Sequence, residues 1–346
     1  MSKALKFQHR IKIERLFDKR KAQELTGFLQ KLSGRGFDVA GVPFRLLDRA
    51  LSTNHTEGLE HMADLANVTR GGQPRLFRSI VEDMSKHGQS SLCSLIRDAE
   101  AHPMTRFEAM GWTVFLRNRA NLPENGTPVS DIFQFWDNPD PPDEIEIGRD
   151  AWAEIPHPGE WYSEGTATDY ITAHFGRDAA KQFQELWHPA SKSDLFRLYR
   201  LVREGGIYAD ADSLPGPGLA AFAKLAGTEA WATSMTNVPN CVANNYFLAG
   251  PPNSPVFEGF LNHVLRNLVE QPVEGIFWLS GPGAFTHYLY ETPSDICLLP
   301  RGTQKEHLFS QFDAAYKHTD SNWRVYEHAR GLTNDSSLRH VLAFLE

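Results

Sequence analysis

Cysteine is scarce in this sequence, with three residues among 346, at Cys93, Cys241 and Cys297. They lie far apart and form no Cys-x-x-Cys pair, which argues against a disulfide scaffold or a structural zinc site and favours a reducing compartment. The sequence also lacks any apolar run of about 18 residues, and its charged N-terminus has no apolar core of a secretory signal. We therefore expect a cytoplasmic protein without a membrane-spanning helix.

Positive charge is in deficit, since 35 Lys and Arg stand against 43 Asp and Glu, for a net charge of −8. The chain is far less basic than a typical nucleic-acid-binding domain, so we expect no nucleic-acid partner. The basic residues nevertheless gather at the start of the chain, which is either a solvated first helix or a peripheral contact with an anionic membrane. They are Lys3, Lys6, Arg10, Lys12, Arg15, Lys19, Arg20 and Lys21.

The hydrophobic pattern divides the chain near residue 125. Up to about residue 120, leucines recur at helical spacing, first in Leu25, Leu29 and Leu32 and then through residues 46–96. A turn-rich linker occupies residues 121–128. The pattern thus predicts a helical region of unknown role over residues 1–125.

Beyond the linker, short strand patterns alternate with helical ones. The alternation predicts an α/β domain over residues 126–346, with helices on the faces of a sheet and ligands beyond the carboxyl ends of its strands. The expected strands cover 131–136, 207–210, 230–234, 245–249 and 296–299. The expected helices cover 143–153, 166–185, 193–204, 253–270 and 283–291.

One continuous stretch, residues 193–212, combines several polar signals. It reads Ser-Asp-x-x-Arg, an apolar helix, Gly-Gly-Ile-Tyr and then Asp-x-Asp. Asp194 and Arg197 are three residues apart and share one helix face. Ser191 or Ser193 is the expected N-cap of this helix, and the glycine pair is its expected end.

The Asp-x-Asp pair, Asp210 and Asp212, follows a predicted buried strand. Two carboxylates two residues apart in an extended chain point to the same side. Both could therefore reach one hard cation such as Mg²⁺ or Mn²⁺, which keeps open positions for substrate phosphates.

The whole string resembles the DXD-containing sugar-binding region of retaining glycosyltransferases, a group that includes yeast-type α-mannosyltransferases, α-1,4-sugar transferases and glucosylating clostridial toxins. The resemblance covers about residues 131–325. It implies a GT-A-type, Rossmann-like domain that binds a UDP- or GDP-sugar and needs Mn²⁺ or Mg²⁺. The implied reaction moves a hexose, with retention, to a hydroxyl group of a carbohydrate, lipid-linked or protein acceptor.

The resemblance also implies roles for residues that bind the donor. Trp136, at the end of the first strand, would stack on the nucleotide base, or else lie in the core under the following loop. Asp194 and Arg197 would bind hydroxyl groups of the donor sugar, as would the amides of the strand that carries Asn244 and Asn245. Tyr208 would contact the ribose or the sugar, or be a buried strand residue.

The metal and the diphosphate would be bound by two segments far apart in the sequence. Asp212 and His318 would hold the metal, and Asp210 would bind ribose or join the metal's shell through water. Ser321 and Trp323 would touch the β-phosphate, although Asn322 separates this Ser and Trp, which commonly adjoin in the family.

Two other classes of function remain open. A nucleotidyltransferase or a nucleotide-sugar hydrolase would use the same metal–diphosphate chemistry, but the Gly-rich phosphate loop expected for attack on a nucleoside triphosphate is absent. A catalytically degenerate transferase could act as a sugar-nucleotide-binding module, but every polar residue of the matched pattern is present.

Overall fold

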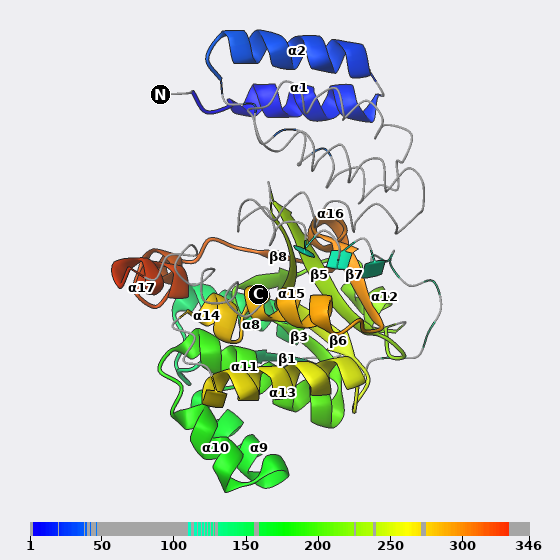
Figure 1. Ribbon diagram of the computed structural model, residues 1–346. Helices are drawn as coiled ribbons and strands as arrows, with labels where there is room; N and C mark the ends of the chain where they lie inside the picture. The colour runs from blue at the N-terminus through cyan, green and yellow to red at the C-terminus, as the bar shows by residue number, and fades with distance from the viewer. Residues whose placement is uncertain are drawn as a thin grey trace. The chain divides into compact units, whose positions relative to one another are not determined.

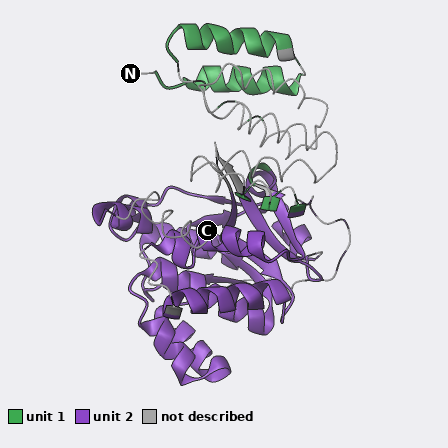
Figure 2. Ribbon diagram, in the orientation of Figure 1, with its two compact units in different colours: residues 1–117, 235–241, 300–302 green, residues 118–234, 242–299, 303–346 purple. Residues whose placement is uncertain are grey.

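The computed structural model describes residues 3–19, 21–37 and 131–331, the last stretch with gaps at 156–158, 225, 238–239 and 271–274, together with single positions between 39 and 128. The chain divides into two compact units (Figure 2). Unit 1 comprises residues 1–117, 235–241 and 300–302, and unit 2 comprises residues 118–234, 242–299 and 303–346. The helices predicted within 46–96 and much of the linker at 121–128 fall outside the described residues.

Unit 1 contains two helices of similar length, α1 (Phe7–Asp18) and α2 (Ala22–Gly34), which pack against each other. Their buried side chains recur at helical spacing, as the sequence predicts, and the helical expectation is confirmed for these two segments. The buried residues are Ile13, Leu16, Leu25, Leu29 and Leu32. Among the described residues, no helix is both long enough and apolar enough to cross a bilayer.

The main sheet has six strands in the order β2-β1-β3-β6-β5-β7 (Figure 1). Strand β1 pairs in parallel with β2 and with β3, whereas β3 pairs antiparallel with β6. The predicted α/β class is thereby confirmed. The strands are β1 (Ile132–Phe135), β2 (Glu160–Tyr162), β3 (Gly206–Ala209), β5 (Ala230–Asn237), β6 (Asn240–Gly250) and β7 (Ile296–Pro300).

A second, two-stranded ladder lies outside the main sheet and was not predicted. It joins β4 (Ser213–Pro215), which directly follows the Asp-x-Asp motif, to β8 (Phe309–Gln311) in antiparallel register. This pairing places the segment after β8 alongside the motif.

Helix α11 (Pro189–Glu204) packs against β1, β3 and α13 (Pro255–Glu270), and α11 and α13 lie side by side in Figure 1. The helices predicted at 143–153 and 283–291 are also present, as α8 and α15. The remaining elements are α8 (Asp143–Ala153), α9 (Glu164–Phe175), α10 (Arg177–Gln184), α12 (Leu219–Ala223), α14 (Ile276–Leu279), α15 (Pro282–Glu291), α16 (Arg301–Thr303), a π-helical turn η4 (Gln304–Leu308), a 3₁₀ turn η5 (Ala315–His318) and α17 (Trp323–Ala329).

Two helix boundaries differ from the prediction. The single helix expected at 166–185 is two helices, α9 and α10, because Gly176 adopts a positive φ of 91° that interrupts the helix. Helix α11 begins at Pro189 and not after Ser191 or Ser193. His188 is its N-cap, with Nδ1 accepting from the N–H of Ala190 at 3.0 Å, and proline suits the first helical position because no N–H is needed there.

The glycine pair between α11 and β3 is required by backbone geometry. Gly205 and Gly206 have φ of 70° and 111°. A Cβ atom on Gly206 would lie 2.6 Å from the carbonyl oxygen of Asp131, closer than real contacts allow.

We expect Gly206→Ala to lower the free energy of unfolding by about 2 kcal/mol or more, because the side chain adds a backbone clash to an unfavourable φ. Urea denaturation measures this change. The control is Gly165→Ala in α9, where the new Cβ would lie 3.8 Å from Ser163 Oγ, an ordinary contact, and where the change should stay within about 1 kcal/mol. Equal effects of the two substitutions would contradict the explanation.

Candidate active site

The Asp-x-Asp motif lies in a turn between β3 and β4 whose backbone is held from three sides. The N–H of Asp210 donates to the carbonyl of Tyr246 at 3.0 Å, and the carbonyl of Asp210 accepts from Gln134 Nε2 at 3.1 Å. The N–H of Phe312 donates to the carbonyl of Asp212 at 3.0 Å. The two carboxylates therefore start from a fixed backbone.

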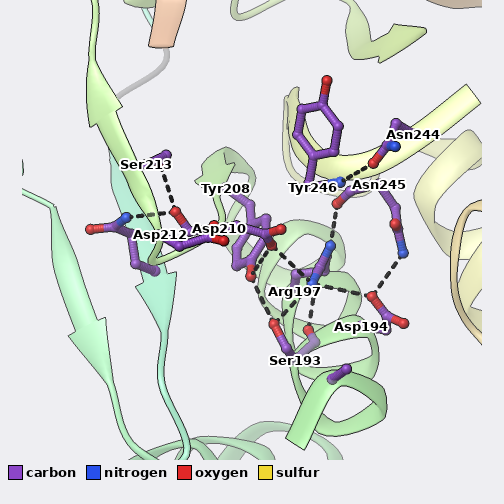
Figure 3. Close-up of polar contacts among 12 residues, drawn as sticks. Ser193, Asp194, Arg197, Tyr208, Asp210, Asp212, Ser213, Asn244, Asn245 and Tyr246 are labelled. Carbon is purple, nitrogen blue, oxygen red and sulfur yellow. Dashed lines mark hydrogen bonds and ion pairs between the residues drawn. The ribbon is translucent and has the colours of Figure 1, made fainter. Parts of the chain in front are cut away.

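Arg197 is the centre of the polar cluster in Figure 3. Its Nη2 lies 3.1 Å from Asp194 Oδ1 and 3.3 Å from Asp210 Oδ1, and it donates to Ser193 Oγ at 2.9 Å. The guanidinium lies 4.2 Å from the ring centre of Tyr208, a cation–π distance. The predicted contact between Asp194 and Arg197 on one helix face is confirmed, and Arg197 also joins the helix to the Asp-x-Asp motif.

Asp194 is buried and fully hydrogen-bonded. Its Oδ1 accepts from Asn245 Nδ2 at 2.8 Å and its Oδ2 accepts from Ser280 Oγ at 2.9 Å. Burial raises the pKa of Asp194 to about 6, against the opposing effects of Arg197 and these two donors. Asn244 is buried as well, but its Oδ1 accepts from the N–H two residues further along its own strand. Of the two asparagines, only Asn245 is seen in contact with Asp194.

Asp210 and Tyr208 form the next layer of this cluster. Tyr208 is 1% exposed, and its hydroxyl lies 2.7 Å from Ser193 Oγ and donates to Asp210 Oδ1 at 3.0 Å. Burial raises the pKa of Asp210 to about 7, and the nearby Asp212 adds to the rise, whereas Arg197 opposes it. Tyr208 is thus a buried strand residue whose hydroxyl orients Asp210.

Asp212 is 3% exposed and has an unequal environment at its two oxygens. Oδ2 accepts from the hydroxyl of Tyr316 at 2.9 Å and lies 2.6 Å from Lys317 Nζ. Oδ1 is buried without a hydrogen-bond partner. The sequence pattern indicated neither Tyr316 nor Lys317, whose one signal was their place immediately before His318 in the chain.

The two carboxylates of the motif fit a divalent cation whose remaining coordination positions would be filled by oxygen atoms of a substrate. The buried Oδ1 of Asp212 is an open oxygen ligand, and oxygen is the donor that Mg²⁺ prefers and Mn²⁺ accepts. Within the described part of the chain, no three or more His, Cys, Asp or Glu side chains gather as a metal-binding group. Among the described residues, Asp210 and Asp212 are the carboxylates of the motif that such a cation could use, and a cation held by two carboxylates keeps positions for water and phosphate oxygens.

His318 is not placed with these carboxylates. Its side chain is 72% exposed, and its Nε2 lies 3.4 Å from Asp313 Oδ1, another exposed group. Ser321 is also exposed. The structure brings the two preceding residues, not His318, to Asp212.

Asn322 connects this segment to α17. Its Oδ1 caps the helix by accepting from the N–H of Arg324 at 3.0 Å, and its Nδ2 donates to the carbonyl of Lys317 at 2.6 Å. Trp323 begins the helix and stacks on Phe277 of α14, with ring centres 6.1 Å apart. The residue that separates Ser321 from Trp323 thus has a structural use as the helix cap.

Trp136 follows the last residue of β1 and is half-buried. Its ring meets that of Tyr316 edge-on at 5.2 Å, and both pack against a small core that includes Ala211. Trp136 therefore lies on the same side of the motif as the side chains that contact Asp212, with part of its surface open.

A third cation, Arg324, interacts electrostatically with the motif besides Arg197 and Lys317. The guanidinium of Arg324 lies 4.3 Å from the ring centre of Trp323. Arg324 lies at the surface, and its charge interacts with those of Asp210 and Asp212. No motif in the sequence pointed to Arg324.

Comparison with known proteins adds family information to this geometry. Residues 160–220 match the model of a family described as "Glycosyltransferase sugar-binding region containing DXD motif". The matched span contains the helix–strand–turn that carries Asp194, Arg197, Tyr208, Asp210 and Asp212.

No curated protein sequence matches the chain significantly. Among solved structures, one described as "PaToxG Glycosyltransferase" is 16% identical, with a TM-score of 0.35 over 59% of this chain and 77% of that chain. The similarity to this glycosyltransferase family is confined to residues 160–220, which contain the Asp-x-Asp motif.

Proposed function

We propose that this chain transfers a hexose from a UDP- or GDP-sugar to a hydroxyl group, with the Asp-x-Asp motif as the site that would hold Mn²⁺ or Mg²⁺. The observation that carries the proposal is the buried, unpartnered Oδ1 of Asp212 inside the region matched by the glycosyltransferase family. An unpaired buried carboxylate oxygen is costly unless a ligand completes it.

The chain's own cations would bind the leaving diphosphate. Asp210 and Asp212 would hold the metal, which when bound stabilises negative charge on the leaving group. The charge of Arg324 interacts with both carboxylates, and its guanidinium would bind phosphate oxygens near them. The hydroxyl of Ser321 and the indole N–H of Trp323 would donate further hydrogen bonds to the β-phosphate.

The buried cluster would orient the donor sugar and the ribose. Asp194 and Arg197, supported by Asn245 on β6, would fix hydroxyl groups of the sugar so that its anomeric carbon faces the acceptor. The amide of Asn244 on the same strand would face the donor sugar. Tyr208 would hold Asp210 towards the ribose. We infer retention with attack on the same face, in which a leaving phosphate oxygen accepts the proton of the acceptor hydroxyl.

The acceptor would be a hydroxyl group of a carbohydrate, a lipid-linked molecule or a protein. We assign the reaction to residues 126–346 and to the cytoplasm. The support for this domain assignment is that the motif residues all belong to unit 2, which begins at residue 118.

Helix α1 supports a peripheral contact between the chain and an anionic membrane. Phe7 and Ile11 are 77% and 48% exposed, and they lie four residues apart on one helix face. Exposed basic residues on the same helix, including Arg10, can interact with lipid phosphates.

We expect the full chain to sediment with phosphatidylserine vesicles and not with phosphatidylcholine vesicles. Replacing Phe7 and Ile11 by Ser should reduce the bound fraction several-fold, because about 0.8 kcal/mol is lost for each CH₂ no longer buried. Ile147→Ser, at a position 66% exposed on α8, is the control and should bind as the parent does. Unchanged sedimentation of the double variant would show that Phe7 and Ile11 do not make the membrane contact.

Trp136→Ala tests stacking on the nucleotide base. Loss of a stacked aromatic costs about 1–3 kcal/mol, so the dissociation constant of UDP or GDP should rise at least several-fold in calorimetric titration, with little change in Tm. The control is Phe175→Ala, another half-buried aromatic, which packs on Tyr199 away from the motif. A large fall in Tm with unchanged nucleotide affinity would show that Trp136 is only a core residue.

Asp212→Asn tests the metal-binding role directly. The substitution keeps the shape of the side chain but removes the charge that attracts a cation. Release of nucleoside diphosphate from the donor should fall by about 10²-fold or more, equivalent to about 3 kcal/mol of transition-state stabilisation. Donor affinity should also lose its dependence on Mn²⁺. Asp150→Asn, at a side chain 76% exposed, should change neither property, and metal-dependent turnover near the parent value in Asp212→Asn would contradict the proposal.

A further inference from the structure

Lys317 occupies one oxygen of the carboxylate that the proposed reaction needs for its metal. Its Nζ lies 2.6 Å from Asp212 Oδ2 and also donates to the carbonyl of Phe312. The Asp212 side chain is 4% exposed, so the carboxylate of this ion pair is largely shielded from water. A buried carboxylate without a counter-charge is costly, and here the chain itself supplies the counter-charge.

The backbone around Lys317 is fixed, although its side chain is not enclosed. Pairing of β4 with β8 aligns Ser213 with Gln311, and Asn322 holds the carbonyl of Lys317. The Lys317 side chain is 24% exposed. The ammonium group can therefore leave Asp212 by rotation of a flexible four-carbon stem while the backbone stays in place.

The charges around the motif disfavour a lone divalent cation. Three carboxylates (Asp194, Asp210 and Asp212) stand beside the side-chain cations Arg197 and Lys317, with Arg324 within range of the same acids. Adding Mn²⁺ at Asp212 would place two further positive charges next to the Lys317 ammonium. Like charges this close repel strongly in a poorly hydrated site. A diphosphate would remove the excess of positive charge.

We propose that Lys317 is the counter-ion of Asp212 in the empty site and a ligand of the diphosphate in the loaded site. When Mn²⁺ and nucleotide bind together, the ammonium group moves from Asp212 Oδ2 to a phosphate oxygen, and no covalent bond changes. Lys317 thereby makes metal binding depend on the nucleotide. This inference rests on the proposed function for the identity of both ligands.

Mn²⁺ titration of the full chain, followed by the electron paramagnetic resonance signal of free Mn²⁺, tests the proposal. The parent should bind Mn²⁺ weakly alone and about tenfold or more tightly with saturating UDP or GDP, after subtraction of Mn²⁺ bound by the nucleotide itself. Lys317→Met should bind Mn²⁺ alone about tenfold more tightly than the parent and should lose most of the effect of the nucleotide.

Two control variants separate this effect from a general change in charge. Lys192→Met also removes a lysine from a close ion pair, with Nζ 2.5 Å from Glu164 Oε1, and should bind Mn²⁺ as the parent does. Lys317→Arg keeps the positive charge and should also match the parent without nucleotide. If Lys317→Met fails to fold, Lys317→Gln still donates to Asp212 and should show the same gain in Mn²⁺ affinity.

The outcomes distinguish this inference from the function on which it rests. Parent-like Mn²⁺ affinity of the neutral Lys317 variants without nucleotide overturns the inference. A parent that binds Mn²⁺ equally well with and without nucleotide also overturns it, but leaves the proposed metal-dependent transfer standing. A parent that binds no Mn²⁺ under any of these conditions overturns the metal in the proposed function, and the inference with it.

Discussion

The buried guanidinium of Arg197 is the interaction on which the site depends. It contacts Asp194 on its own helix and Asp210 after β3, and it also donates to the backbone carbonyl of Asn245 on β6. An arginine 4% exposed must keep its partners, because breaking a buried ion pair costs about 3–5 kcal/mol. The requirement ties α11, β3 and β6 together at one point, so the helix cannot shift without moving the Asp-x-Asp motif.

The local part of this arrangement could be predicted from sequence because its signals are close together in the chain. Three-residue spacing places Asp194 beside Arg197 on a helix. Gly205 and Gly206 mark the tight passage into β3, and their positive φ values bear out the predicted helix end. The α/β class likewise followed from alternating patterns, although Gly176 divided one expected helix, since a glycine within a helical pattern does not reveal its φ.

The parts of the site that could not be predicted from sequence depend on contacts between distant segments. Ser280 donates to Asp194 across 86 residues, and Tyr316 donates to Asp212 across 104. These contacts exist because β4 pairs with β8 and α14 lies near α11. Three-residue strands carry too little pattern to reveal such pairing in one sequence. The family-based expectation for His318 pointed to the right segment, but the 3₁₀ turn directs Tyr316 and Lys317 to the motif instead.

The central claim is that the site cleaves a nucleoside diphosphate sugar with help from a divalent cation. The most direct measurement incubates the full chain with each of a panel of UDP- and GDP-sugars, with Mn²⁺ or with a chelator, and quantifies released nucleoside diphosphate. The account predicts slow release from donors of one base, dependent on Mn²⁺ and faster once a suitable acceptor is added. Release of pyrophosphate from a nucleoside triphosphate, with every sugar donor left intact, would contradict it.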